Sequence, residues 1–149
     1  MLRGAYRFAK FTAENNQQKQ QVTLMGSGAI LLEVLTAAKL LVAQGIDVEV
    51  ISVTSWSELA RDGRACADQD TKTVAHLTTL LSQSQGPVLA ASDYVCAVTE
   101  SVRAFIPEGR RYKTLGTDGF GRSDTRAALR NYFEVDAAAI VRVATSMLT

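Results

Sequence analysis

Short β-branched runs alternate with longer amphipathic runs along most of this sequence, and this alternation limits the folds that the chain can adopt. A strand–helix–strand order favours parallel strands, because the helix carries the chain back across one face of the sheet. The pattern predicts a three-layer α/β domain with a mostly parallel sheet. The expected strands are residues 22–25, 47–53, 88–91 and 112–115, and the expected helices are residues 30–42, 56–61, 73–82, 93–105, 123–132 and 136–147.

Local signals define several of the helix ends. Gly45 stands just after the first helical run, where a C-cap glycine belongs. Ser55 and Glu58 have the spacing of a capping box, so a short helix is expected to begin there and to be ended by Gly63. Asp136 is expected to cap the last helix through its carboxylate.

The length and charge of the chain restrict its organisation and its partners. A chain of 149 residues can form one domain with its own core. The net charge is +1, which gives no electrostatic reason to expect nucleic acid or an anionic membrane as a partner. Residues 12–21 are polar and have no apolar periodicity. We therefore expect an N-terminal segment and linker at residues 1–21, and the folded domain at residues 22–149.

The cysteines and the N-terminus indicate a cellular compartment. Cys66 and Cys96 lack the spacing of metal ligands and the chain has one histidine, so a structural zinc site is not expected. Two free cysteines are typical of a reducing cytosol. Arg3, Arg7 and Lys10 interrupt the N-terminus before a signal peptide could form, and no apolar run approaches the roughly 20 residues that span a bilayer. We expect a cytoplasmic protein.

Three short motifs could carry chemistry, and for each we favour a structural interpretation. Gly26-Ser27-Gly28 could hold a small anion at a helix N-terminus, but it lacks the third glycine of a dinucleotide fingerprint, and a tight turn is favoured. His76 is expected to be a surface or boundary residue rather than a base. Ser92-Asp93 and Ser123-Asp124 fit helix caps better than nucleophiles, because neither lies in a G-x-S-x-G sequence.

The run at residues 115–126, LGTDGFGRSDTR, gathers glycines and charged residues between an expected strand and an expected helix. Such loops often display binding groups. Arg122 and Arg126 are four residues apart and could form a fork for a carboxylate or a phosphate. We favour internal pairing of these arginines with Asp118 or Asp124 over ligand binding.

The same run contains an aromatic side chain between two glycines, Phe120. A large aromatic residue in such a loop suggests docking onto a neighbouring domain or subunit. A metal site at Asp118 is not expected, because the later Asn131 lies too close to complete a magnesium–diphosphate motif.

Several ordered blocks of the sequence resemble one family, and the set is more specific than any block alone. The chain resembles the C-terminal domain of the homodimeric pyruvate dehydrogenase component and, more broadly, transketolase C-terminal domains. The resemblance implies a three-layer α/β/α domain with a five-stranded, mostly parallel mixed sheet and one antiparallel edge strand. The blocks are residues 4–8 (GAYRF), 24–31 (LMGSGAIL), 53–63 (VTSWSELARDG), 92–94 (SDY), 115–126 and 133–136 (FEVD).

The resemblance also implies where the chemistry of such an enzyme takes place. Members of that family bind thiamine diphosphate and magnesium between their N-terminal and middle domains, across a dimer. Those domains also hold the catalytic histidine and glutamate residues. Neither domain is present in this sequence, so no catalytic, cofactor-binding or metal-binding residue is expected in it. The chain is expected to be a structural and dimer-interface domain, inactive alone.

The parent enzyme implied by this resemblance decarboxylates pyruvate and transfers the acetyl group to the lipoyl group of an acyltransferase component. The expected partners are the remaining domains of that parent and a second subunit. Residues 64–85 depart from the family, because they lack its proline and aromatic residues. A stand-alone regulatory or interaction module that binds a small anion, at residues 26–28 or at Arg122 and Arg126, is the alternative.

Overall fold

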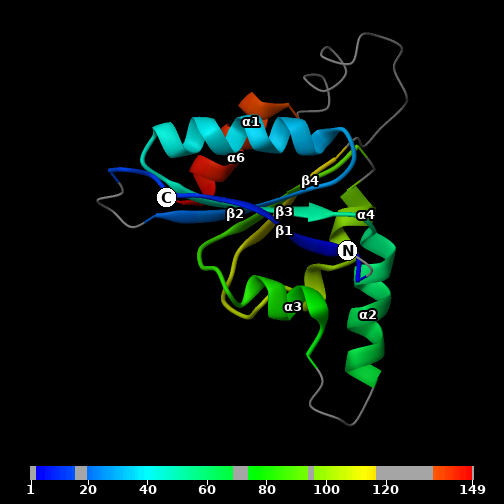
Figure 1. Ribbon diagram of the computed structural model, residues 1–149. Coiled ribbons are helices and arrows are strands. Elements are labelled where there is room, and N and C mark those ends of the chain that lie inside the picture. Colours follow the sequence, from blue (N-terminus) through cyan, green and yellow to red (C-terminus); the bar gives the residue numbers. More distant parts are fainter. Residues whose placement is uncertain (1–2, 16–19, 69–73, 94–95, 117–135, 149) are drawn as a thin grey trace, which may run out of the picture.

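The computed structural model describes residues 3–15, 20–68, 74–93, 96–116 and 136–148. Within them, strands and helices alternate along the chain (Figure 1). The elements in order are β1 (Ala5–Phe11), β2 (Gln21–Gly26), α1 (Ile30–Ala43), β3 (Asp47–Val53), α2 (Trp56–Asp68), α3 (His76–Leu81), β4 (Val88–Ala91), α4 (Cys96–Glu100), the 3-10 helix η1 (Arg103–Phe105), β5 (Tyr112–Leu115) and α6 (Ala137–Met147).

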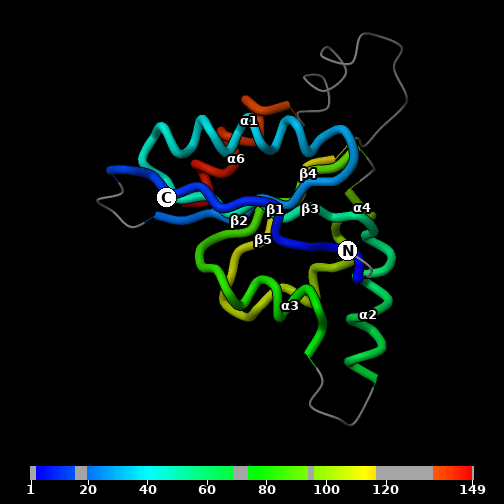
Figure 2. The backbone as a smooth tube through the Cα atoms, viewed as in Figure 1, coloured from blue at the N-terminus to red at the C-terminus, as the bar shows by residue number. Residues whose placement is uncertain are grey.

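The strands form one five-stranded sheet in the order β1-β3-β2-β4-β5. Strands β2, β3, β4 and β5 pair in parallel, and β1 pairs with β3 in the antiparallel direction. Helices α1 and α6 cover one face of the sheet, and α2 and α3 lie on the other (Figures 1 and 2). This arrangement confirms the predicted three-layer fold with a mostly parallel mixed sheet. No helix within the described ranges is both long enough and apolar enough to cross a bilayer.

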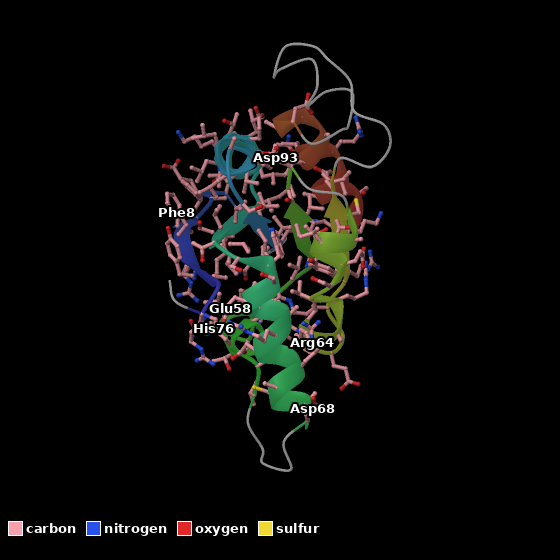
Figure 3. The ribbon with its side chains drawn as sticks, turned by 90° about the vertical axis from the view of Figure 1, so that its right-hand side faces the viewer. Phe8, Glu58, Arg64, Asp68, His76 and Asp93 are labelled. Atoms are coloured by element: carbon pink, nitrogen blue, oxygen red, sulfur yellow. The ribbon has the colours of Figure 1, made fainter. Side chains whose placement is uncertain are left out.

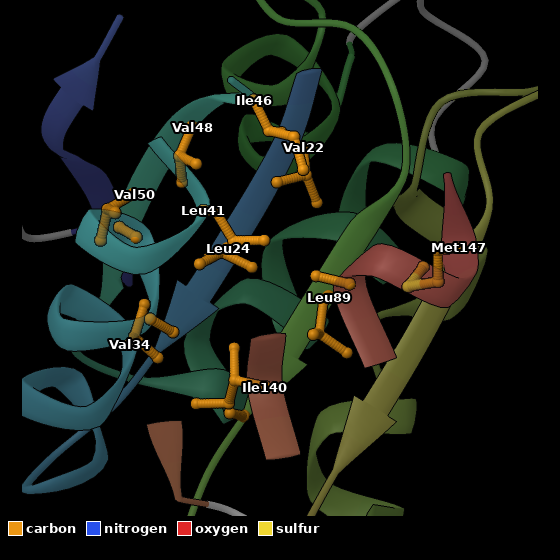
Figure 4. Close-up of a cluster of buried hydrophobic side chains, with 14 of the residues drawn as sticks. Val22, Leu24, Val34, Leu41, Ile46, Val48, Val50, Leu89, Ile140 and Met147 are labelled. Atoms are coloured by element: carbon orange, nitrogen blue, oxygen red, sulfur yellow. The ribbon is translucent and has the colours of Figure 1, made fainter. Parts of the chain in front are cut away.

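Each face of the sheet has its own hydrophobic core, because successive side chains of a strand point to opposite faces. In β2, Val22 and Leu24 face α1 and α6, whereas Met25 joins the core on the α2 and α3 side. Figure 4 shows the first core, in which Leu41 of α1 and Ile140 of α6 close over the strands. The alternation explains why the β-branched runs of the sequence are buried on both sides.

Strand β1 lies in residues that the sequence analysis assigned to an N-terminal segment. Residues 5–11 form the antiparallel edge of the sheet instead of a separate segment, and their pairing with β3 runs from Ala5 opposite Val53 to Phe11 opposite Val48. The strand assignments missed this strand, although the resemblance implied an antiparallel edge strand. The sheet therefore draws its edge strand from the region before the polar stretch.

A β-bulge at Phe8 explains why β1 lacks a recognisable strand pattern. The pairing passes from Arg7 opposite Ile51 directly to Ala9 opposite Val50, so Phe8 is the extra residue. The bulge reverses the facing of the side chains along the strand. Ala5 joins the core beneath α2 and α3, whereas Ala9 packs on the opposite core. A sequence search for simple alternation cannot detect a strand whose facing changes in the middle.

Three predicted helix ends are confirmed. Gly45 follows α1 with a φ of 84°, as expected of a C-cap glycine. The backbone N–H of Glu58 donates to Ser55 Oγ at 3.1 Å, which confirms the predicted N-cap of α2. Asp136 Oδ1 accepts from the backbone N–H of Ala139 at 2.9 Å, as predicted for the cap of α6.

Two helix predictions were wrong in their extent. Helix α2 does not end at Gly63 but continues to Asp68, and Gly63 is buried where an added Cβ would lie 2.5 Å from ring carbons of Phe105. This glycine permits close packing inside a helix. The helix expected over residues 93–105 is broken after Glu100, because the Thr99 carbonyl accepts from the buried Tyr112 hydroxyl at 2.7 Å.

Candidate functional site

The carboxyl ends of the central strands meet at a topological switch point. From β2 the chain crosses through α1 to β3 on one side, and from β3 it crosses back to β4 on the other side of β2. Ligands of open α/β sheets bind at such a reversal of strand order. A cleft of about 390 Å³ lies at this edge of the sheet. Its lining residues are Ser27, Gly28, Val53, Thr54, Ser55, Trp56, Ser57 and Val98.

Ser27, in the turn after β2, is bonded to two side chains from other parts of the fold. Trp56 Nε1 donates to Ser27 Oγ at 3.0 Å, and Ser27 Oγ donates to Ser92 Oγ at 3.2 Å. All three residues are buried, with Ser27 8% and Trp56 4% exposed. The hydroxyl therefore joins the turn after β2 to the start of α2 and to the end of β4.

Gly26, the last residue of β2, and Gly28, in the turn that follows, have different surroundings. A Cβ on Gly26 would lie 2.8 Å from Val34 Cγ2, so this residue lets α1 pack against the turn. A Cβ on Gly28 would lie 3.8 Å from the Asp93 carboxylate. A carboxylate beside the turn repels an anion. Together with the internal bonds of Ser27, this favours the structural interpretation of residues 26–28 over anion binding.

The wall of the cleft that follows β3 is held by the N-terminal end of the chain. The backbone N–H groups of Thr54 and Ser55 both donate to the Gly4 carbonyl, at 2.8 Å and 3.0 Å. Ser55 Oγ in turn caps α2 and lies 3.1 Å from Ser57 Oγ. The backbone donor that a full capping box would use is thus bonded to Gly4.

His76 and Asp62 lie together on the α2 and α3 side of the sheet. The Asp62 carboxylate accepts from the His76 backbone N–H at 2.7 Å and from Arg3 at 3.2 Å. Partial burial raises the pKa of Asp62, but the hydrogen bonds from His76 and Arg3 outweigh it, and the pKa lies below its usual value. The ring Nε2 of His76 donates to the Ala5 carbonyl at 3.0 Å. These contacts fit the structural role expected of this histidine.

A charged network that the sequence analysis did not identify lies under the sheet on the same side. Glu49 of β3 is 1% exposed, and Arg7 Nε donates to its Oε1 at 2.9 Å. Arg110 donates to the Leu81 carbonyl at 2.6 Å and to Thr23 Oγ1 at 3.1 Å. Burial lowers the pKa of Arg110. The sequence did offer one signal of this network, which is Glu49 within the otherwise apolar run DVEVISV. An acid in a buried strand needs a partner, so it predicts a basic or polar side chain nearby.

The predicted run at residues 115–126 is described only at its beginning. Asp118, Phe120, Arg122, Asp124 and Arg126 lie outside the described residues, and their binding or docking roles stay predictions. The elements before and after this run, β5 and α6, lie near the carboxyl edge of the sheet. Strand β5 ends at residue 115 beside the end of β4. At the start of α6, the backbone N–H of residue 137 donates to Glu33 of α1 at 2.9 Å.

Acidic and histidine side chains do not gather into a metal site in the part of the chain that the structure describes. No group of three or more His, Cys, Asp or Glu residues there could hold a metal ion.

Residues 4–136 match the family model of the transketolase-like TK C-terminal domain. The chain belongs to this family. Among curated relatives, the pyruvate dehydrogenase E1 component of Cupriavidus necator is 42% identical over 143 residues, which are 91% of this chain and 16% of the relative. The Escherichia coli K12 pyruvate dehydrogenase E1 component is 42% identical over 137 residues, which are 87% of this chain and 15% of the relative. The chain thus spans about one sixth of the length of these relatives.

Solved transketolases share the fold of this family member. A transketolase from Campylobacter jejuni aligns with a TM-score of 0.65 and 22% identity, over 97% of this chain and 18% of that chain. A split-gene transketolase, solved as an inactive beta4 tetramer, aligns with a TM-score of 0.62 and 20% identity, over 94% of this chain and 42% of that chain. At these identities the likeness shows the fold.

Proposed function

We propose that this chain is the C-terminal structural and dimer-interface domain of a thiamine-diphosphate-dependent, pyruvate dehydrogenase-like enzyme. The observation that carries the proposal is the 42% identity to pyruvate dehydrogenase E1 components, over nearly the whole of this chain. The parent would decarboxylate pyruvate and transfer the acetyl group to a lipoyl group. Its partners would be the remaining domains of the parent, a second subunit and the lipoyl acyltransferase component.

The polar groups of the cleft support a structural role for this domain. The Ser27 hydroxyl is bonded to Trp56 and Ser92, and the Ser55 hydroxyl caps α2. Polar groups that are satisfied by one another rigidify a fold and give little to a ligand. The catalytic chemistry of the parent would then lie outside this chain, and we expect the parent to act in the cytoplasm.

A chimeric enzyme tests this function directly. The part of the Escherichia coli pyruvate dehydrogenase E1 component that aligns with this chain would be replaced by residues 4–149 of this chain. We expect the chimera to form a dimer and to release carbon dioxide from pyruvate, whereas the E1 component without its C-terminal part should be inactive. A chimera that folds and dimerises but has no activity would contradict the proposal.

The isolated chain gives a second test. Calorimetry with thiamine diphosphate and magnesium is expected to give no binding heat, because the cofactor site of the parent would be formed by other domains. Tight, magnesium-dependent binding of the cofactor to this chain alone would refute the assignment of a structural role.

A further inference from the structure

The first residues of the chain are held by a set of contacts that we call the N-terminal clamp, formed by Arg3, Gly4, Ala5, Asp62 and His76. Asp62 of α2 binds the Arg3 guanidinium through Oδ1 and the His76 backbone N–H through Oδ2. The His76 ring donates to the Ala5 carbonyl. Figure 3 shows His76 beside α2, in agreement with these bonds. One carboxylate therefore joins the start of the chain to two helices.

The clamp continues into the cleft through backbone groups. Between the two clamped residues Arg3 and Ala5, the Gly4 carbonyl accepts from the N–H groups of Thr54 and Ser55. There is no room for a side chain at Gly4, since a Cβ would lie 2.7 Å from the Ser55 carbonyl oxygen. The start of the chain thus lies directly against the turn that lines the cleft.

From that turn the bonds lead to the switch point. Ser55 Oγ caps α2 through the N–H of Glu58, and Trp56, the first residue of α2, donates its indole N–H to Ser27. Ser27 in turn donates to Ser92 at the end of β4. These hydrogen bonds, joined by the backbone from Arg3 to Gly4 and from Ser55 to Trp56, connect Asp62 with the carboxyl ends of β2 and β4.

We propose that the N-terminal clamp positions the cleft: Asp62 holds Gly4 against residues 54–55, and this contact fixes the Trp56–Ser27 bond. Asp62 is a positioning residue, because it touches neither Ser27 nor the cleft lining directly. The proposal rests on the proposed function for its biological meaning. If other domains precede this one in the parent, their connection at residue 3 is mechanically coupled to the switch point of the sheet.

Hydrogen exchange measured by NMR on the 149-residue chain tests the coupling. The reporters are the Thr54 and Ser55 amides and the indole N–H of Trp56, the single tryptophan of the chain. Asp62→Ala should leave α2 intact, because alanine favours a helix more than aspartate does. We expect this variant to accelerate exchange of all three reporters by about fivefold to tenfold, the effect of losing one hydrogen bond of ordinary net strength.

Asp68→Ala is the matched control, since it removes an exposed acid from the C-terminal end of the same helix (Figure 3). It should leave the three reporters unchanged. Arg3→Gln, at an exposed residue, should accelerate exchange of the same three reporters, with the same ranking among them as in Asp62→Ala but by a smaller factor.

Three results would overturn the proposal. Unchanged reporters in Asp62→Ala would show that Asp62 does not hold the first residues. Faster amides with an unchanged Trp56 indole would show that the clamp does not reach the cleft. Equal effects of Asp62→Ala and Asp68→Ala would show a general loosening of α2. None of these results depends on which parent enzyme contains the domain, so they are independent of the chimera experiment.

Discussion

Replacing Ser27 by alanine should destabilise the domain although the substitution removes a single oxygen atom. The Ser27 hydroxyl accepts from Trp56 Nε1 at 3.0 Å and donates to Ser92 Oγ at 3.2 Å. In Ser27→Ala the indole N–H would be left without this acceptor in a site where Trp56 is 4% exposed. An unsatisfied buried donor is costly, because it loses its bond to water as well.

The size of the effect follows from these two bonds. Leaving the indole N–H of Trp56 unpaired costs about 1–3 kcal/mol, and the bond to Ser92 contributes about 1 kcal/mol. We therefore expect Ser27→Ala to lower the free energy of unfolding by about 2–4 kcal/mol. For a chain of 149 residues this corresponds to a melting temperature lower by about 4–16 °C.

Urea unfolding followed by circular dichroism measures this change, with Ser57→Ala as the control. Ser57 is exposed and its hydroxyl lies 3.1 Å from the Ser55 hydroxyl, so the loss of this surface hydroxyl should cost less than about 0.5 kcal/mol. In a Trp56→Phe background the cost of Ser27→Ala should fall by about 1 kcal/mol or more, because no indole donor remains. A Ser27→Ala variant as stable as the control would refute the reasoning.

Three further predictions concern residues outside the cleft. Arg7→Met should destabilise the domain by about 2–3 kcal/mol in urea unfolding, because it leaves the buried carboxylate of Glu49 without its partner at 2.9 Å; Glu49→Leu in the same chain should recover most of the loss. Gly86→Ala should cost at least about 2 kcal/mol, because φ is 85° and a Cβ would lie 1.9 Å from the Gln21 carbonyl oxygen; a variant of normal stability would contradict the geometry. Burial raises the pKa of Tyr112, so the neutral phenol stabilises the fold fully at pH values below its ordinary pKa of about 10. This stabilisation is lost as the pH rises above that value, so the urea midpoint should fall at alkaline pH. Tyr112→Phe should make this fall smaller.

The sequence predicted elements whose physical signals are local. The run Asp47–Val53 is rich in β-branched residues and forms β3, which pairs with β1 and with β2. The Ser55 and Asp136 caps depend on contacts three residues away, so spacing alone reveals them. Strand β1 escaped this approach, because the bulge at Phe8 removes the period of two on which strand recognition depends.

Errors arose where a distant contact overrides a local preference. Gly63 has the sequence context of a helix end, yet it lies inside α2, where the ring of Phe105 occupies the space that a side chain would take. The break after Glu100 depends on the Tyr112 hydroxyl, which comes from another element of the sheet. Such pairings over long sequence separations cannot be read from propensities or spacing.

The candidate site also has a part that could be predicted from the sequence and a part that could not. The sequence predicted a tight turn at Gly26-Ser27-Gly28 from the glycines and from their position after a strand. That Ser27 accepts from Trp56 could not be predicted, because the two residues are brought together by the crossover from β2 through α1 and β3. The clamp at Asp62 needed the fold as well, since Arg3 and Asp62 meet only when β1 lies at the edge of the sheet.

The bonds at the carboxyl edge explain how a fold with a ligand-binding geometry can serve a structural role. In open α/β sheets the switch point is where polar groups reach a ligand. In this domain the Ser27 hydroxyl and the Trp56 indole bind each other, and Ser92 completes the set. Groups satisfied in this way hold three chain segments in a fixed arrangement. We therefore expect this edge to act as a rigid support next to the end of β5, where residues 115–126 begin. Variants that loosen the edge should lower the activity of the chimeric enzyme even when the isolated chain still folds.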